Sequence, residues 1–392
     1  MLAGLAGPLC DTAHDGWFHA LDADGRPDLA AGKTCYDHAF VLLGTSSAVV
    51  AGLPGADALL AAASTVFLER FWDEDAGRCR DEWSADWSRL DSYRGLNANM
   101  HAVEAMLAVA DATGDLSWRR RAARVADFVV DLAARYDARL PEHFDAAWTS
   151  LPDLNADRPA DPFKPYGATI GHGLEWSRLL LTLDAVAPDE RLLPTAEALF
   201  DRAVADGWSV DGTPGFVYTT DWSGTPVVRD RMHWVLAEAL AAAAALLART
   251  GEQRYAAWFR EWWAHAEDVF IDRAQGSWHH QTRRGQPPRG GRVAGQARPL
   301  PRGPGHPAPA APALPHSRPR DPGRSLAVTP PEVLVVGEAL IDIVQRAGQD
   351  PVEPARGEPA PTSRWHSAGS GTTPAWRPCS PTTSAARCCD AG

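Results

Sequence analysis

The residues best suited to acid–base chemistry lie in the sequence GHGLEW, at positions 171–176. On a helix, His172 and Glu175 are i, i+3 neighbours, so the carboxylate can orient the imidazole and raise its basicity. Gly171 and Gly173 flank the histidine and would let another group approach closely. The alternative interpretation is a structural histidine whose hydrogen bonds are made within the helical core, which is the more common role of a single histidine.

Two further stretches place polar groups at helical spacing. In NANMHAVE, Asn97, His101 and Glu104 fall at i, i+4 and i+7 and share one helix face. The alternative interpretation is an N-capping asparagine followed by polar groups that pair with one another. In RMHWVLAE, Trp234 and Glu238 are i, i+4 neighbours and offer an aromatic wall and a hydrogen-bond acceptor.

None of these clusters has the spacing of a metal or nucleotide site. His172 and Glu175 resemble half of a ligand set, but no H-E-x-x-H or paired Cys/His pattern follows them. The glycines in the opening residues lack a P-loop lysine and a preceding strand. We therefore expect no metal and no cofactor.

Helices must position these side chains, because apolar residues recur at i, i+3 and i+4 over most of the first 281 residues. The predicted helices are Tyr36–Gly52, Ala56–Phe71, Leu96–Gly114, Ser117–Tyr136, Ala168–Val186, Pro194–Gly207, Arg229–Thr250 and Gln253–Asp272. Polar stretches with Gly and Trp separate successive pairs and recur about every 64 to 71 residues. One unit is therefore two helices plus a small hairpin or loop, and such units must stack to bury their apolar faces.

Stacked helix pairs can form an open solenoid or close into a toroid. The many tryptophans, with His, Glu and Asn at helix starts, favour an all-α toroid with a lined central pocket. Eight helices are fewer than the twelve of a closed ring.

Composition changes sharply after Gln281. Residues 1–281 carry a net charge of −18, whereas residues 282–392 carry +6 and hold 20 of the 32 prolines. Such Pro/Arg-rich composition is typical of a disordered segment. The overall charge of −12 argues against nucleic acid as a partner, and no apolar run is long enough to span a membrane. The six scattered cysteines and the absence of a basic region at the start indicate a cytoplasmic protein.

Four long strings resemble the N-acylglucosamine 2-epimerase superfamily, and within it the bacterial aldose–ketose isomerases that act on mannose or sulfoquinovose. They are DSYRGLNANMHAVEAM, YGATIGHGLEWSRLLL, GFVYTTDWSGTPVVRDRMHWVLAEA and GSWHHQ. The resemblance covers nearly all of residues 8–281. It implies an (α/α)6 barrel, which agrees with the helix pairs.

The resemblance also implies roles for individual residues. His172 corresponds to one of two catalytic histidines, and Glu175 supports it. The sugar-binding positions match Tyr36, Asn97, His101, Trp234 and Glu238. An imidazole base can move the C2 proton of an open-chain aldose to C1 through a cis-enediol without a metal.

The chain departs from the family pattern at both ends. We expect the preceding helix pair, with its Trp and Arg, to be missing, so that the barrel is incomplete. After Gln281 the family continues with VWPGKPDLYH, whose final residue is the second catalytic histidine, whereas this chain continues TRRGQPPRGG. For residues 282–309, codons can be chosen that encode a segment containing the family peptide when they are read one base later. We therefore expect a shifted reading frame near Thr282.

A short strand-like segment follows within the second part. Residues 332–345, EVLVVGEALIDIVQ, resemble the opening strand of ribokinase-like (PfkB) sugar kinases. The predicted organisation is a partial barrel domain (1–281), a Pro/Arg-rich disordered or out-of-frame segment (282–327), an isolated strand (328–346) and a disordered tail (347–392).

The sequence thus predicts a sugar isomerase with a monosaccharide substrate, no nucleic-acid or membrane partner, and impaired activity in this form. It leaves the sugar and the oligomeric state open. The alternatives are a sugar 2-epimerase, a glycoside hydrolase on the same fold, and a helical-repeat binding protein without enzymatic activity. A hydrolase would need two carboxylates across a pocket, and a binding protein would lack convergent polar groups.

Overall fold

The computed structural model describes residues 2–22, 24–274 and 276–282. The predictions for the Pro/Arg-rich segment, the kinase-like strand and the tail lie outside these residues. The helices are α1 (Leu2–Leu5), α2 (Cys35–Val50), α3 (Ala56–Val66), α4 (Leu96–Thr113), α5 (Ser117–Arg135), α6 (Ile170–Val186), α7 (Leu192–Gly207), α8 (His233–Thr250) and α9 (Gln253–His265).

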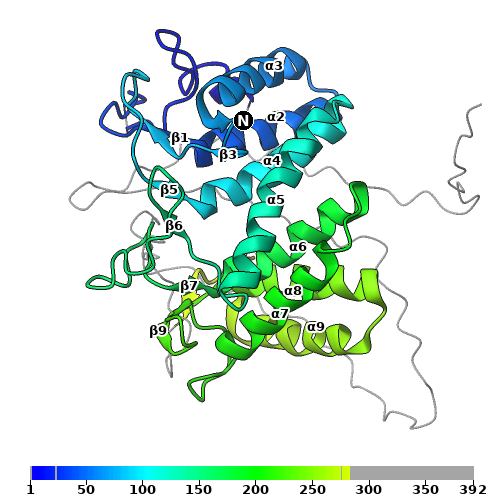
Figure 1. Cartoon of the computed structure of the whole chain (residues 1–392). Coiled ribbons are helices and arrows are strands. Elements are labelled where there is room, and N and C mark those ends of the chain that lie inside the picture. Colours follow the sequence, from blue (N-terminus) through cyan, green and yellow to red (C-terminus); the bar gives the residue numbers. More distant parts are fainter. Residues whose placement is uncertain (1, 23, 275, 283–392) are drawn as a thin grey trace, which may run out of the picture. The chain divides into compact units, whose positions relative to one another are not determined.

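The long helices form four consecutive pairs, α2/α3, α4/α5, α6/α7 and α8/α9. We call the first member of each pair its leading helix. Each leading helix packs on the next one along the chain, from α2 through α4 and α6 to α8 (Figure 1). The predicted stacking of two-helix units is therefore confirmed.

Very short antiparallel strands connect the pairs. They are β1 (Lys33–Thr34), β2 (Trp72–Asp73), β3 (Arg78–Cys79), β4 (Glu82–Trp83), β5 (Arg94–Gly95), β6 (His143–Phe144), β7 (Ala168–Thr169), β8 (Thr219–Thr220), β9 (Pro226–Val228), β10 (Arg231–Met232), β11 (Ile271–Asp272), β12 (Ser277–Trp278) and β13 (Gln281–Thr282). The pairings are β1–β4, β2–β3, β5–β6, β7–β8–β9, β10–β13 and β11–β12. Strands β1, β5, β7 and β9 lie on the left in Figure 1, at one end of the helices.

Every leading helix begins at the residue that follows a strand: α2 after β1, α4 after β5, α6 after β7 and α8 after β10. The hydrogen bonds of these strands fix where each helix starts. Local caps contribute as well, because Thr34 accepts a hydrogen bond from the Asp37 backbone N–H at 3.0 Å. Gly114 and Gly251 end α4 and α8 in the left-handed conformation that glycine adopts without strain.

The predicted helices agree with the observed ones to within a few residues at most ends. Among the helix starts, the largest difference is at α8, which begins at His233 after strand β10 and not at Arg229. In addition, α3 and α9 each change into one π-helical turn, Phe67–Phe71 and Ala266–Phe270. None of the described helices is long and apolar enough to cross a membrane.

Candidate active site

His172 is the third residue of α6, and its imidazole is bound by a carboxylate from outside that helix. Its Nδ1 lies 2.8 Å from Oε1 of Glu142, a buried residue directly ahead of strand β6. Helical spacing predicted Glu175 as the residue that orients this ring. At Nδ1 the structure shows a further carboxylate, that of Glu142, which helical spacing did not identify.

Trp234, the second residue of α8, lies against the His172 ring. The two ring centroids are 5.5 Å apart at an interplanar angle of 37°, and Tyr218 packs edge-on against the indole at 6.0 Å. Gly171 makes this approach possible, since a Cβ at that position would lie only 2.2 Å from the Trp234 ring. The predicted close approach beside His172 is therefore confirmed on the Gly171 side.

Replacing Gly171 with alanine is expected to displace the Trp234 ring and to destabilise the protein by about 1–3 kcal/mol, the usual cost of overpacking. Gly173→Ala is the matched control on the same helix, because its Cβ would meet its nearest neighbour at an ordinary 3.7 Å. Urea unfolding measures both effects. Equal stability of the two variants would contradict the assignment of Gly171 as the residue that admits the indole.

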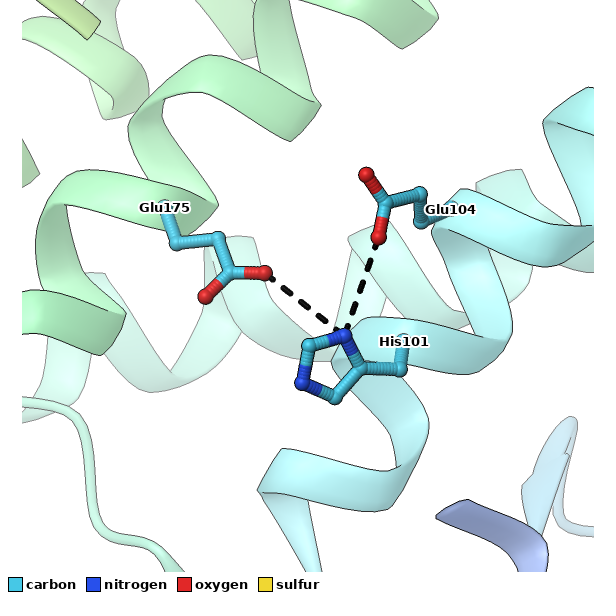
Figure 2. Close-up of side chains that lie close together, drawn as sticks. All are labelled: His101, Glu104 and Glu175. Atoms are coloured by element: carbon cyan, nitrogen blue, oxygen red, sulfur yellow. Dashed lines mark ion pairs between the residues drawn. The ribbon is translucent and has the colours of Figure 1, made fainter. Parts of the chain in front are cut away.

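A second group of side chains gathers where α4 faces α6. Nδ1 of His101 lies 3.7 Å from Oε2 of Glu104 on its own helix and 3.7 Å from Oε1 of Glu175 on α6 (Figure 2). His101 and Glu175 are buried, and His101 Nδ1 has no hydrogen-bond partner among the described residues. The sequence-predicted residues His101 and Glu175 are therefore brought together, although they are 74 positions apart.

Arg178 supplies the positive charge of this group. Its Nε donates to Glu238 Oε2 at 2.9 Å, and its terminal nitrogens lie 3.6 Å from Glu104 and 3.9 Å from Glu175. Burial alone would raise the pKa of Glu104, but contact with His101 and the charge of Arg178 outweigh it and hold that pKa below its ordinary value. The Arg178 guanidinium thus lies within ion-pair distance of three carboxylates, each on a different leading helix. We call Arg178, Glu104, Glu175 and Glu238 the arginine–carboxylate cluster.

The arginine–carboxylate cluster and His101 also contain a possible metal-ligand set. Single ligand atoms of His101, Glu104 and Glu175 all lie within 4.8 Å of one another. Imidazole and carboxylate are suitable ligands for a transition metal. Arg178 already stands beside both carboxylates, however, so the protein supplies a cation at this position itself.

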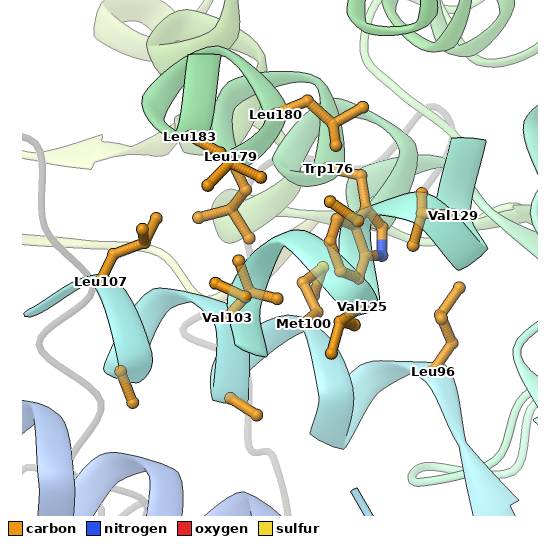
Figure 3. Close-up of a cluster of buried hydrophobic side chains, with 14 of the residues drawn as sticks. Leu96, Met100, Val103, Leu107, Val125, Val129, Trp176, Leu179, Leu180 and Leu183 are labelled. Atoms are coloured by element: carbon orange, nitrogen blue, oxygen red, sulfur yellow. The ribbon is translucent and has the colours of Figure 1, made fainter. Parts of the chain in front are cut away.

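Apolar packing holds the two helices that carry most of these groups. Along α4, Leu96, Met100, Val103 and Leu107 form a stripe at helical spacing, and along α6 Trp176, Leu179, Leu180 and Leu183 form another (Figure 3). Val125 and Val129 of α5 belong to the same cluster. All ten side chains are buried. The polar faces of α4 and α6 are therefore fixed by a dense apolar core behind them.

Aromatic residues of α2 border the imidazole of His101. Tyr36 and Phe40 each lie with their ring centroid 4.9 Å from it. Asn97, on the next leading helix, has a buried side-chain oxygen without a hydrogen-bond partner among the described residues. It is the second residue of α4 and does not cap the helix, since the N-cap is Gly95. An unsatisfied buried acceptor of this kind suits a ligand hydroxyl.

The polar residues of RMHWVLAE, at positions 231–238, divide into two groups in the structure. Trp234 and Glu238 reach the site, whereas Arg231 pairs with Asp211 at 2.6 Å and His233 contacts the backbone oxygen of His280 at 3.0 Å. Sequence reasoning missed Glu142 and Arg178. Arg178 could have been found, because it continues the i, i+3 series of His172 and Glu175 on α6.

An imidazole hydrogen-bonded to a carboxylate, beside an aromatic ring and polar side chains at successive helix starts, is an arrangement suited to proton transfer on a small polar substrate. The family model for N-acylglucosamine 2-epimerase (GlcNAc 2-epimerase) matches residues 2–298. The chain belongs to this family.

Two curated relatives are D-mannose isomerases. That of Thermobifida fusca is 57% identical over 283 residues, covering 71% of this chain and 69% of the relative. That of Pseudomonas cannabina pv. alisalensis is 48% identical over 288 residues, with the same shares covered. The chain is therefore a sugar isomerase or epimerase, and the glycoside hydrolase and binding-protein alternatives are set aside.

Known structures agree on the fold. A crystal structure of D-mannose isomerase aligns with a TM-score of 0.65 at 32% identity, covering 69% of this chain and 70% of that one. Cellobiose 2-epimerase from Spirochaeta thermophila aligns with a TM-score of 0.64 at 20% identity, covering 74% and 72%. The predicted (α/α)6-barrel architecture is confirmed for the described helix pairs.

Proposed function

We propose that the protein interconverts an aldose and a ketose of the mannose and fructose type, with His172 as the acid–base catalyst. The observation that carries this proposal is the half-buried His172 imidazole, which is hydrogen-bonded to Glu142 at Nδ1 and lies against the Trp234 ring. Two D-mannose isomerases are 57% and 48% identical to the chain, which supports the same substrate class.

In the proposed reaction His172 removes the proton from C2 of the open-chain aldose. The electron pair of the C2–H bond forms the C1=C2 bond of a cis-enediol, and O1 gains a proton. The imidazolium then returns its proton to C1 while O2 loses its own and becomes the ketone oxygen. The net change is a shift of hydrogen from C2 to C1 and from O2 to O1, which needs no oxidant or reductant.

We assign the sugar-binding roles to residues on three leading helices, α2, α4 and α8. Asn97 offers its unsatisfied oxygen, His101 and Glu238 offer hydrogen-bonding groups, and Tyr36 and Trp234 offer aromatic faces for the apolar side of a hexose. Glu175 is proposed to act beside His101, with which it is in ion-pair range.

A neutral hexose fits these residues better than sulfoquinovose does. A sulfonate is bound best by a cationic side chain in the pocket. The arginines beside the site motifs in the sequence include Arg94, Arg229 and Arg231. Arg229 and Arg231 lie beside Asp211, and Arg94 donates to the backbone oxygens of Asp91 and Tyr93. Arg178 is committed to three carboxylates. We therefore favour mannose, with a 2-epimerase as the second candidate because it shares the enediol.

We further propose that residues 1–281 form the catalytic domain and that turnover by the whole chain is slow. The resemblance places a second catalytic histidine beyond residue 281, where this chain has Pro301 and Arg302. The free thiols of Cys10, Cys35 and Cys79 support the cytoplasm as its compartment.

The test is NMR of mannose, fructose and glucose incubated with the full chain in D2O. We expect slow appearance of fructose from mannose with deuterium at C1 or C2, because the base exchanges its proton with solvent. Glucose formed from mannose would favour the epimerase instead. The proposed function would be contradicted if the sugars stayed unchanged after long incubation with this chain and also with a second chain. In the second chain, residues 282–309 are replaced by the family segment that contains VWPGKPDLYH.

A further inference from the structure

The Glu142 carboxylate lies against the imidazole of His172. It is 5% exposed, and the hydrogen bond that it accepts is that from His172 Nδ1 at 2.8 Å. Its backbone oxygen accepts from the Leu96 N–H at 2.9 Å, at the first residue of α4. The residue is thereby anchored between the starts of α4 and α6, and its side chain is aimed at the imidazole.

An ionised carboxylate accepts hydrogen bonds and cannot donate them. The proton of a neutral His172 must therefore be on Nδ1, which leaves the lone pair on Nε2. A base that removes a proton from carbon needs that lone pair free on the side of the substrate. A histidine without such a partner divides its proton between both nitrogens.

We propose that Glu142 is the positioning residue of the reaction: it holds His172 in the Nδ1–H tautomer and stabilises the imidazolium formed when Nε2 takes the C2 proton. This inference rests on the proposed role of His172 and extends it. Glu142 does not touch the substrate in this scheme, and it acts through His172 alone.

Other groups around His172 are neutral or already paired. The pKa of His143 on β6 lies below its ordinary value, chiefly because the residue is buried, and burial raises the pKa of Tyr218, ahead of β8, to about 12. Charged or titratable groups on the packed helices include Glu175 and Arg178 on α6, His101 and Glu104 on α4, Glu238 on α8, and Asp206 on α7, which pairs with Arg139. Glu142 is the carboxylate that accepts a hydrogen bond from the imidazole.

The experiment uses the full chain labelled with ¹⁵N-histidine, with the His172 signals assigned by their loss in His172→Gln. In the unsubstituted chain we expect a single neutral tautomer protonated at Nδ1. In Glu142→Gln, whose amide can either accept or donate, we expect mixed tautomers, a titration midpoint lower by about 1 pH unit, and C2 exchange slower by roughly 10²-fold with little change in KM.

Two controls separate a positioning role from a structural one. Glu142→Asp keeps the charge and should largely preserve the tautomer and the titration midpoint. Glu197→Gln removes a carboxylate that accepts from Tyr255 outside the site and should change neither. An unchanged tautomer and midpoint in Glu142→Gln would overturn this inference even if His172 proves essential. If His172→Gln exchanges C2 as fast as the unsubstituted chain, the proposed base is wrong, and Glu142 then has no positioning role in the reaction even if it sets the tautomer.

Discussion

Replacing His172 with glutamine is expected to slow exchange of the sugar C2 proton by about 10²–10⁴-fold, the usual contribution of a general base. Glutamine keeps much of the volume and the polarity of the imidazole. It cannot take a proton near neutral pH. Because the substrate-binding groups are untouched, the effect should appear in the rate far more than in KM.

The measurement is the initial rate of deuterium incorporation into mannose and fructose, compared with that of the unsubstituted chain. His265→Gln is the control, since His265 is a partly buried histidine that packs against Trp208, outside the site described above. Equal exchange rates for His172→Gln and the unsubstituted chain would rule out His172 as the base.

Replacing Arg178 with methionine is expected to destabilise the fold by about 3–5 kcal/mol, the range seen when one partner of a buried ion pair is removed. Methionine preserves the length of the side chain but leaves the carboxylates of Glu104, Glu175 and Glu238 facing one another without a cation. Arg191→Met is the control, because Arg191 pairs with Asp127 and Asp189 at the surface, where such pairs contribute about 0–1 kcal/mol.

The same variant gives a pH test with a definite sign. The pKa of Glu104 in the folded protein lies below its ordinary value, so this carboxylate stabilises the fold above its ordinary pKa, and that contribution is lost as the pH falls through the folded-state pKa. The difference in unfolding free energy between Arg178→Met and the unsubstituted chain should therefore be largest near pH 7 and shrink below about pH 4. Chemical unfolding at both pH values measures it. A difference that grows on acidification would contradict the assigned charges.

Most of the helical architecture could be predicted from the sequence, because helices are encoded locally. The stripe of Leu96, Met100, Val103 and Leu107 has helical spacing, and it is the same stripe that packs in the core. The two-residue strands could not be predicted in this way. Their pairing, such as Arg94 with Phe144, joins residues about 50 positions apart, and two residues show no alternation of polarity.

The candidate site was predicted in part for the same reason. Asn97, His101, His172, Trp234 and Glu238 each stand out by spacing within one helix, and each lies in the first two turns of a leading helix. The partner of His172 did not follow from spacing, because Glu142 is 30 residues away and lies outside α6, directly ahead of β6. Local spacing therefore located groups that share one helix but did not reveal the carboxylate at Nδ1, which lies on a separate segment.

The start of each leading helix directly after a strand has an electrostatic consequence. The backbone N–H groups at a helix start are unpaired within the helix and carry a partial positive charge, equivalent to about half an elementary charge. Because β1, β5 and β7 lie at one end of the helices (Figure 1), the starts of α2, α4 and α6 lie at that end, and their peptide dipoles direct positive potential toward it. An enediol intermediate that carries excess electron density on its oxygens would be favoured there by the backbone itself, before any side chain is counted.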